Sequence, residues 1–462
     1  MKRIYLLITI LLSVAVAYAQ SGEVEINGAW MKKHYSKVEY MIPMHDDVKL
    51  YTAVYIPKNK KVESPILLCR SERACEPYGK KMVTLWRDAM FEPYLQAEYI
   101  LAFQEVRGKG RSEGETVDAG LESDTYHTIE WLQKKLRRHN GRVGVWGVGE
   151  DCTHAMRAAM SVHSAICAVS PQAMMGKVEV DKPVTAAVLL VDGGMNSDSK
   201  DKTWRQYDVV RQKAPQLDCR LVVGPWSLGA WRKAGALADD NAVEDVSADF
   251  FLTEIEFPFF EHYLRGAENS GASSAGALIY FTGENCWREL SGEDFRRAKE
   301  HKLYLSDDGR LVMDFADAGG STSSRYDAAT PDDALTFVSS VLEEDMTALG
   351  GVELQLYVTT SKECPDFKLM IIDESANAEH EVIVREDVYK GKELAQTQCE
   401  GGVKLLSFRL CDIAHTFFAG GRVKLKIQCL QHSSDNSPND TPEVCLHHDA
   451  KHTSLIRLKV MQ

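Results

Sequence analysis

The sequence predicts an α/β domain built on a doubly wound sheet, followed by an all-β sandwich domain. Two patterns lead to this prediction. From about residue 38 to residue 265, short apolar runs alternate with helical patterns, as is typical of parallel strands joined by crossover helices. Further along the chain, segments such as residues 422–429 alternate polar and apolar residues without a break, which indicates half-buried antiparallel strands.

Six apolar runs of the first domain are expected to be buried parallel strands. They are residues 65–69, 99–103, 143–146, 166–169, 187–191 and 221–223. Between the second and third runs, Ser123 and Asp124 offer an N-cap, and apolar residues then recur at helical spacing through Leu136. Asn140-Gly141 is expected to end that helix.

A small, polar and flexible stretch marks the expected domain boundary at residues 268–276. The first domain is therefore expected to cover residues 20–267 and the second residues 277–462. In the second domain, residues 352–358 and 455–460 show nearly the same alternation as residues 422–429. Gly, Asp and Ser turns separate these segments, which favours a sandwich.

The first nineteen residues have the pattern of a secretory signal peptide. Lys2 and Arg3 precede an apolar run over residues 4–16, and Ala17-Tyr18-Ala19 forms a small-x-small cleavage site. The apolar run is shorter than the roughly 20 residues that cross a bilayer. We therefore predict cleavage after Ala19, a secreted or periplasmic protein, and no membrane span after cleavage.

Composition excludes some classes of protein. The chain has 462 residues, of which 44% are hydrophobic and 26% charged, as in ordinary globular proteins, and its length favours two domains. A net charge of -13 argues against a nucleic-acid binder, which needs Lys and Arg to displace counterions from phosphates.

The cysteines and histidines do not form a pattern that predicts a metal or a cofactor. The eleven cysteines are scattered and lie mostly in apolar runs, so most are expected to be buried, and a Cys69–Cys75 disulfide stays open. None has zinc-ligand spacing. His447 and His448 are adjacent, so on a strand they point to opposite faces.

Residues 142–152 form the most informative segment. A strand runs into a glycine-rich turn, and an Ala-rich helix follows from His154 to Met160. An α/β-hydrolase carries its nucleophile in such a turn, at the centre of G-x-S-x-G, where the side chain is exposed above the sheet. The central position in this chain is Gly149.

The chain resembles the cocaine-esterase-type serine hydrolases, a family that includes X-Pro dipeptidyl-peptidases and α-amino-acid ester hydrolases. The matching stretches are residues 42–51, 103–108, 112–114, 123–131, 140–144, 170–173 and 224–227, followed by 283–287, 303–306 and 448–450. The resemblance implies an α/β-hydrolase domain followed by a jelly-roll sandwich.

The resemblance also locates the family's catalytic positions, and none holds a catalytic residue here. The serine falls on Gly149, the aspartate on Asn196 and the histidine on Leu228. The oxyanion-hole tyrosine falls on Arg73, and the residue after the nucleophile is Glu150.

The resemblance further implies that the family's helical cap is largely deleted. Only residues 174–183 separate Ala173 from the next apolar strand, where relatives carry a large helical lid.

Other polar or nucleophilic residues lie near the same turn in the sequence. Cys152 is the nearest thiol and is a weak nucleophile candidate, against a buried or helix-cap cysteine. Arg73 and Glu150 are interpreted as an ion pair, as a charged recess for a ligand, or as two solvated charges. Residues 107–112 lack P-loop spacing and are interpreted as a turn after a strand.

The leading functional hypothesis is an exported, non-catalytic member of the family that binds a peptide, an ester or a carbohydrate. The alternative is an active serine-hydrolase-type esterase or dipeptidyl-peptidase that uses substitute residues. A third hypothesis is an envelope-interaction protein that uses the sandwich domain. The sequence leaves open whether the protein is an enzyme.

Overall fold

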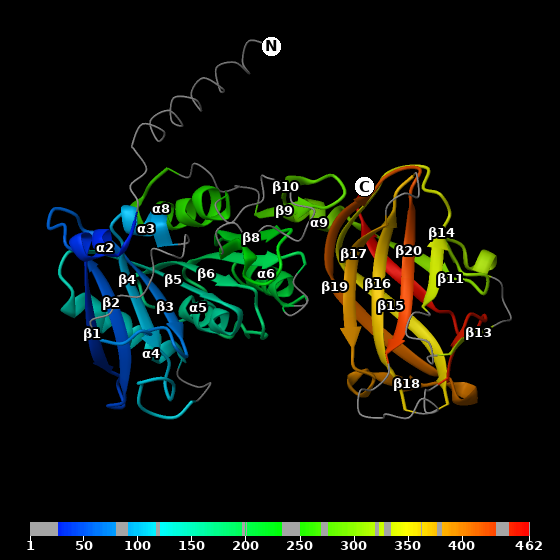
Figure 1. The fold of residues 1–462 in the computed structure, drawn as a ribbon, viewed down its shortest axis with the longest axis horizontal. Helices are drawn as coiled ribbons and strands as arrows, with labels where there is room; N and C mark the ends of the chain where they lie inside the picture. Colours follow the sequence, from blue (N-terminus) through cyan, green and yellow to red (C-terminus); the bar gives the residue numbers. More distant parts are fainter. Residues whose placement is uncertain are drawn as a thin grey trace, which may run out of the picture.

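A computed structural model describes the chain from Ile26 to Met461, with gaps. The described residues are 26–79, 91–116, 121–195, 199, 201–232, 250–268, 276–318, 323–327, 334–361, 363–376, 381–430 and 443–461. The predicted signal peptide and Asn196 lie outside these residues. An α/β part and an all-β part lie side by side (Figure 1). No helix among the described residues is long and apolar enough to cross a membrane.

In the described part of the chain, the first sheet has ten strands, in the order β1-β2-β4-β3-β5-β6-β7-β8-β9-β10. Their bounds are β1 Tyr35–Pro43, β2 Lys49–Pro57, β3 Ser64–Ser71, β4 Ile100–Glu105, β5 His139–Val148, β6 Ile166–Gln172, β7 Ala187–Gly193, β8 Cys219–Gly224, β9 Ala277–Phe281 and β10 Cys286–Leu290. Neighbouring strands from β4 to β9 are parallel. The six predicted strands are confirmed as β3 to β8.

Helices cover both faces of this sheet (Figure 1). One face packs against α4 (Leu121–Lys135), α5 (Cys152–Ala158) and α6 (Lys202–Lys213), and the other against α2 (Gly28–His34), α3 (Glu92–Gln96) and α8 (Phe257–Arg265). Side chains alternate along a strand, so Leu68 joins the α4–α5 core whereas Leu67 and Cys69 join the α3–α8 core. The first domain is therefore doubly wound, as predicted.

The helix after β4 starts earlier than the sequence predicts. It begins at Leu121, so Ser123 and Asp124 lie inside its first turn and do not form its N-cap. The Asp124 carboxylate instead accepts a bond of 2.6 Å from the guanidinium of Arg107. Asp124, which the sequence pattern predicts as part of the N-cap, therefore forms a tertiary ion pair instead. The helix ends at Lys135, before Asn140-Gly141.

The first sheet also extends past the expected domain boundary. Residues 277–290, which the sequence assigns to the second domain, form β9 and β10 at the edge of the first sheet. The Thr282 amide donates to the Ala414 carbonyl at 3.0 Å, so this edge also contacts the second sheet. Residues 269–275 of the expected linker lie outside the described residues.

The second part of the chain is all-β. Its strands are β11 Lys299–Leu305, β12 Arg310–Val312, β13 Ser323–Asp327, β14 Leu335–Ser339, β15 Met346–Thr360, β16 Asp366–Glu374, β17 Glu381–Tyr389, β18 Gln396–Gln398, β19 Lys404–Phe417, β20 Arg422–Leu430, β21 Glu443–His447 and β22 Leu455–Val460. Phe367 of β16 and Phe408 of β19 lie 5.4 Å apart, although these strands are not hydrogen-bonded neighbours. The strands therefore fold over one core; the jelly-roll connectivity stays a prediction.

A fully buried arginine organises the first domain. Arg70 of β3 donates to the Gln104 amide oxygen of β4 at 2.8 Å and to the Thr125 hydroxyl of α4 at 2.7 Å. Its guanidinium lies 3.6 Å from the Asp124 carboxylate. Burial lowers the pKa of Arg70 to about 10, so the cation persists at neutral pH. This network ties α4 to the two strands below it.

Charged groups also join the two parts of the chain. Arg409 of β19 donates to the Asp201 carboxylate at 2.6 Å, and Arg385 of β17 donates to the Gly194 carbonyl at 2.9 Å. Asp412 lies 3.6 Å from Arg409 and is buried beside the carboxylates of Asp201 and Asp208. Burial first, and then these carboxylates, raise the pKa of Asp412 to about 7, against the opposing effect of Arg409.

Asp124→Ala is expected to destabilise the protein by about 3 kcal/mol, because it leaves the Arg70 cation buried without its counter-charge. Urea unfolding measures the change. Asp46→Ala is the matched control, since Asp46 is the exposed carboxylate that also pairs with Arg107. Equal losses from the two variants would contradict the central role given to Arg70.

Asp412→Asn is expected to flatten the pH dependence of stability. The folded state holds the Asp412 proton more tightly than the unfolded chain does, so stability falls as pH rises from about 4 to about 7 and stays low above it. The variant should gain in melting temperature over the parent at pH 8 and match it near pH 4. Asp317→Asn, an exposed position, is the control. Parallel profiles for parent and Asp412→Asn would refute this account.

Candidate active site

The turn after β5 keeps the backbone of a nucleophile elbow. Gly149 follows the strand directly and has φ +64°, a conformation that side-chain-bearing residues adopt only under strain. A Cβ added there would meet only Met175 Cγ, at 3.9 Å. At Gly147, an added Cβ would lie 2.3 Å from the Asp151 carbonyl oxygen, so the tight turn requires glycine. The elbow thus has its shape and open space but no nucleophile.

Asp151, which the sequence analysis did not single out, lies at this turn. Burial raises the pKa of its carboxyl to about 6; a hydrogen bond with Ser71 opposes the shift, and the charges of Glu150 and Glu72 add to it. Because Glu72 is paired with the Lys109 ammonium, two carboxyl groups, those of Glu150 and Asp151, are left to act where a hydrolase stabilises a developing oxyanion. An oxyanion needs donors or positive charge, so these groups oppose that chemistry.

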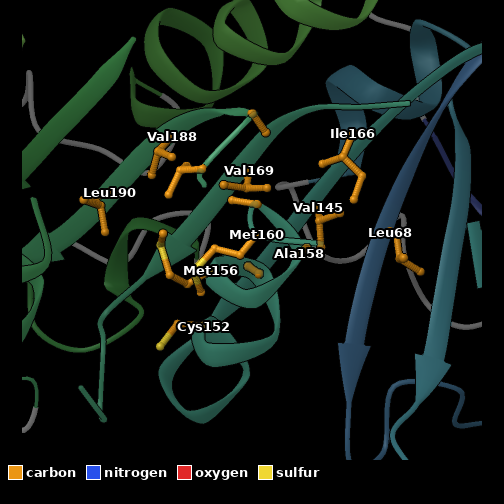
Figure 2. Packing of buried hydrophobic residues seen from close by; sticks show 14 of the residues in the cluster. Leu68, Val145, Cys152, Met156, Ala158, Met160, Ile166, Val169, Val188 and Leu190 are labelled. Carbon is orange, nitrogen blue, oxygen red and sulfur yellow. The ribbon is translucent and has the colours of Figure 1, made fainter. Parts of the chain in front are cut away.

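Cys152 does not provide a substitute nucleophile at this turn. It is the first residue of α5 and is 0% exposed. It belongs to the buried hydrophobic cluster that joins α5 to the sheet, which also includes Met156 and Met160 (Figure 2). Burial raises the pKa of the thiol to about 11, so the reactive thiolate is scarce at neutral pH. The geometry thus favours the alternative of a buried cysteine.

Arg73 and Glu150 are both exposed, and no ion pair joins them within 4.0 Å. The ion pair that would close the site is therefore not formed. Glu72, next to Arg73, pairs with the Lys109 ammonium at 2.5 Å.

The positions expected for the acid and the base follow the neighbouring strands β7 and β8 in the sequence. Asn196 is outside the described residues, but β7 ends three residues before it. There the buried Asp192 carboxylate accepts from the Gly193 amide at 2.9 Å and from the Ser199 hydroxyl at 2.8 Å. Leu228 lies in the loop after β8 and is 38% exposed, with an apolar side chain that cannot transfer a proton.

A buried polar network fixes the loop that carries Leu228. Arg232, four residues further on, donates to the Gln172 amide oxygen at 2.8 Å and to the Glu256 carboxylate at 2.6 Å. Gln172 ends β6 and pairs in register with Val148, the residue before the elbow. The connection from Ala173 to Ala186 then reaches β7 without a helix. The network therefore packs the strand end from which the cap of relatives would leave.

The glycine-rich turn at residues 107–112 is held by the chain's own carboxylate. Glu105 is fully buried and accepts from the Arg111 amide at 2.6 Å and from the Tyr78 hydroxyl at 2.7 Å. The amide that a bound phosphate would need is thus already bonded. The turn is structural in this conformation.

The arrangement of the cysteines and histidines can be described for the part of the chain that the structure covers. There, no three His, Cys, Asp or Glu side chains are placed to hold an ion. All eleven cysteines are free, so the Cys69–Cys75 disulfide left open above is not formed. His447 contacts the Thr359 hydroxyl, whereas His448 is buried against the Phe337 ring.

Comparison with known proteins places this geometry in context. Residues 46–181 match the model of the X-Pro dipeptidyl-peptidase (S15) family. The chain is 21% identical to the cocaine esterase of Rhodococcus sp. (strain MB1 Bresler) over 470 aligned positions, which cover 72% of this chain and 79% of that protein.

Solved structures share the whole fold. An aminopeptidase from a marine sediment Thaumarchaeota archaeon superposes with a TM-score of 0.79 at 19% identity, covering 96% of this chain and 99% of the other. An α-amino acid ester hydrolase gives a TM-score of 0.79 at 20% identity with the same coverage. A CocE/NonD family hydrolase from Staphylococcus aureus gives 0.67 at 14% identity, covering 93% of each chain.

Cys152 is expected to resist alkylation in the folded protein, because its thiol is buried and protonated. Iodoacetamide at pH 8, followed by peptide mass spectrometry, measures modification at each cysteine. The exposed Cys286 is the internal control and should react well before Cys152. Modification of Cys152 at the rate of Cys286 would reinstate it as a nucleophile candidate.

Proposed function

Since the chain belongs to the X-Pro dipeptidyl-peptidase and cocaine-esterase group of hydrolases, we propose that it is a non-catalytic member of that group that acts by binding. The observation that carries this proposal is Gly149, which leaves the elbow without a side chain. Acyl transfer through an elbow needs a hydroxyl or thiol, a base within hydrogen-bond reach, and donors for the oxyanion.

The loss extends beyond the nucleophile. Leu228 supplies no base, and the buried thiol of Cys152 does not substitute for the serine. Hydrolases that lose triad members retain roughly 10³ to 10⁴-fold catalysis over water from binding and the oxyanion hole alone. In this chain the carboxyl groups of Glu150 and Asp151 also oppose the oxyanion, so even this remaining activity is expected to be reduced.

The charge at the elbow suggests a class of ligand. Relatives include an aminopeptidase and an α-amino acid ester hydrolase, whose names point to substrates with a free amino group. Glu150 and Asp151 place acidic groups at the corresponding strand end, where they favour a cation. We therefore propose that an amino-acid ester or a peptide amine binds at this edge and is not cleaved. Export, indicated by the pattern of residues 1–19, completes the proposal.

A residual hydrolase is the second candidate, and one observation favours it. The pKa of Asp151 is raised to about 6, which is within the range of a general base that activates water near neutral pH. Gly149, at the same turn, leaves open space that such a water would need. If the protein is a residual hydrolase, Asp151→Asn abolishes turnover. If it is a binding protein, neither the parent nor the variant shows turnover in a hydrolysis assay.

The purified protein is expected to give no turnover of activated esters or X-Pro dipeptide amides above a blank. A variant with Gly149→Ser, Asn196→Asp and Leu228→His should gain some esterase activity, because the elbow has room for a serine side chain. Adding Asp151→Asn to that variant should raise the activity further, because it removes a charge that opposes the oxyanion. Product release measured by absorbance gives both rates.

Turnover by the parent protein that survives repeated purification and Cys152→Ala would contradict the non-catalytic proposal. Its loss in Asp151→Asn would then identify the general base. A matched Asp317→Asn variant, in the second domain, controls for the change in charge.

A further inference from the structure

A second hollow lies at the opposite edge of the first sheet from the elbow. We name it the amino-edge groove and define it by residues 56–60, 62, 64 and 135–138, with Ser36 and Tyr40 of β1 and Ile100 of β4. Its volume is 520 Å³. Parallel strands β3, β4 and β5 all begin here, whereas Gly149 follows the far end of β5. The groove is therefore separate from the site described above.

Positive charge dominates the lining of this groove. Five cations from two separate segments line it, and no Asp or Glu does: Lys58, Lys60, Lys135, Arg137 and Arg138. All five are exposed, and none makes an ion pair within 4.0 Å with another described residue. In a chain of net charge -13, such a concentration of one sign is unexpected from composition. It focuses a positive field into the hollow.

Helix capping explains only a small part of this charge. α4 ends at Lys135, and the carboxyl end of a helix carries about half a negative charge, which one cation offsets. The cations at positions 58 and 60 come from the connection between β2 and β3, far from that helix in the sequence. One acid is bonded to the lining: Glu98 accepts from the Asn59 amide at 2.8 Å. The excess of positive charge remains.

The two segments that line the groove are hydrogen-bonded to each other, and part of the lining is apolar. The Ser64 amide donates to the Arg138 carbonyl at 2.9 Å, which holds the two cationic segments together. Tyr40 packs edge-on against Trp131 of α4 with the ring centroids 4.8 Å apart. Ile56, Ile100 and Leu136 add aliphatic surface, and Ser36 and Ser64 add hydroxyl groups. An apolar floor with a cationic rim suits an organic molecule that carries anionic oxygens.

We propose that the amino-edge groove is a second binding site, which takes a small organic molecule bearing two or more phosphate or carboxylate groups. The volume is within the range of roughly 300 to 1,000 Å³ that holds small-molecule ligands. Lys and Arg bind both phosphate and carboxylate groups, so the lining of the groove is compatible with phosphate esters and with acidic sugars. The ligand differs in charge from the amine proposed at the elbow.

Calorimetric titration of the purified full chain tests the proposal with three probes: inorganic tripolyphosphate, trigalacturonic acid and the neutral sugar maltotriose. At low salt, at least one anionic probe should bind with a Kd below about 1 mM, and maltotriose should not bind. Binding by tripolyphosphate alone identifies a phosphorylated ligand, and binding by trigalacturonic acid alone identifies an acidic sugar. Affinity should fall as salt rises and the Debye length shortens from about 30 Å to about 8 Å.

The double variant Lys60→Gln with Arg137→Gln should bind the anionic probe with an affinity that is lower by about tenfold or more. Lys33→Gln with Lys213→Gln is the matched control, because it removes two exposed cations outside the groove and should leave the affinity unchanged. Circular dichroism confirms that both variants fold. Absence of binding by both anions, or equal binding by the two double variants, would overturn the proposal.

The elbow variant with Gly149→Ser, Asn196→Asp and Leu228→His separates the two sites. It should bind the anionic probe like the parent protein, whatever its hydrolysis assay shows. Loss of anion binding in that variant would mean that the probe occupies the elbow and not the groove.

Discussion

The buried Arg70 cation is the constraint on which the first domain depends. A guanidinium without water needs a counter-charge and several acceptors, and these come from two elements other than its own strand: Asp124 and Thr125 of α4 and Gln104 of β4. Meeting that need fixes the position of α4 over the sheet. Through Arg107 and Asp46 the same network reaches the turn between β1 and β2. None of its members is at the elbow, so the scaffold does not depend on the residue at position 149.

Under the proposed non-catalytic function, this independence explains how the chain keeps the fold of a hydrolase. The crossover from β5 to α5 needs a close backbone approach at Gly147 and a positive φ at Gly149, and both are requirements of folding. A nucleophilic side chain at Gly149 would add strain and no packing, since an added Cβ meets only Met175. Glycine is therefore the residue that the backbone of this turn itself prefers.

Sequence patterns predict the parts of this structure that depend on local physics. Buried parallel strands are continuous apolar runs, so β3 to β8 were visible as such, and the glycines of the elbow marked its turn. The predicted start of α4 was wrong because the Asp124 carboxylate binds the guanidinium of Arg107 and does not cap the helix. The edge of the first sheet was missed because β9 joins the sheet by a tertiary contact with β8, and β10 then pairs with β9. The raised pKa of Asp151 arises from burial, which no single-sequence pattern reports.

Parallel strands give the first domain two chemically different edges. At the carboxyl edge, Glu150 and Asp151 follow β5, whereas at the amino edge Arg137 and Arg138 precede the same strand. A strand of ten residues spans roughly 33 Å, which is several Debye lengths at physiological salt, so the two fields do not cancel in solution. An anion is then attracted to one edge and repelled from the other, and an amine behaves in the opposite way. The two proposed ligands, which are of opposite charge, are therefore expected to bind one domain without competing, and a catalytic triad at the elbow would not by itself require this property.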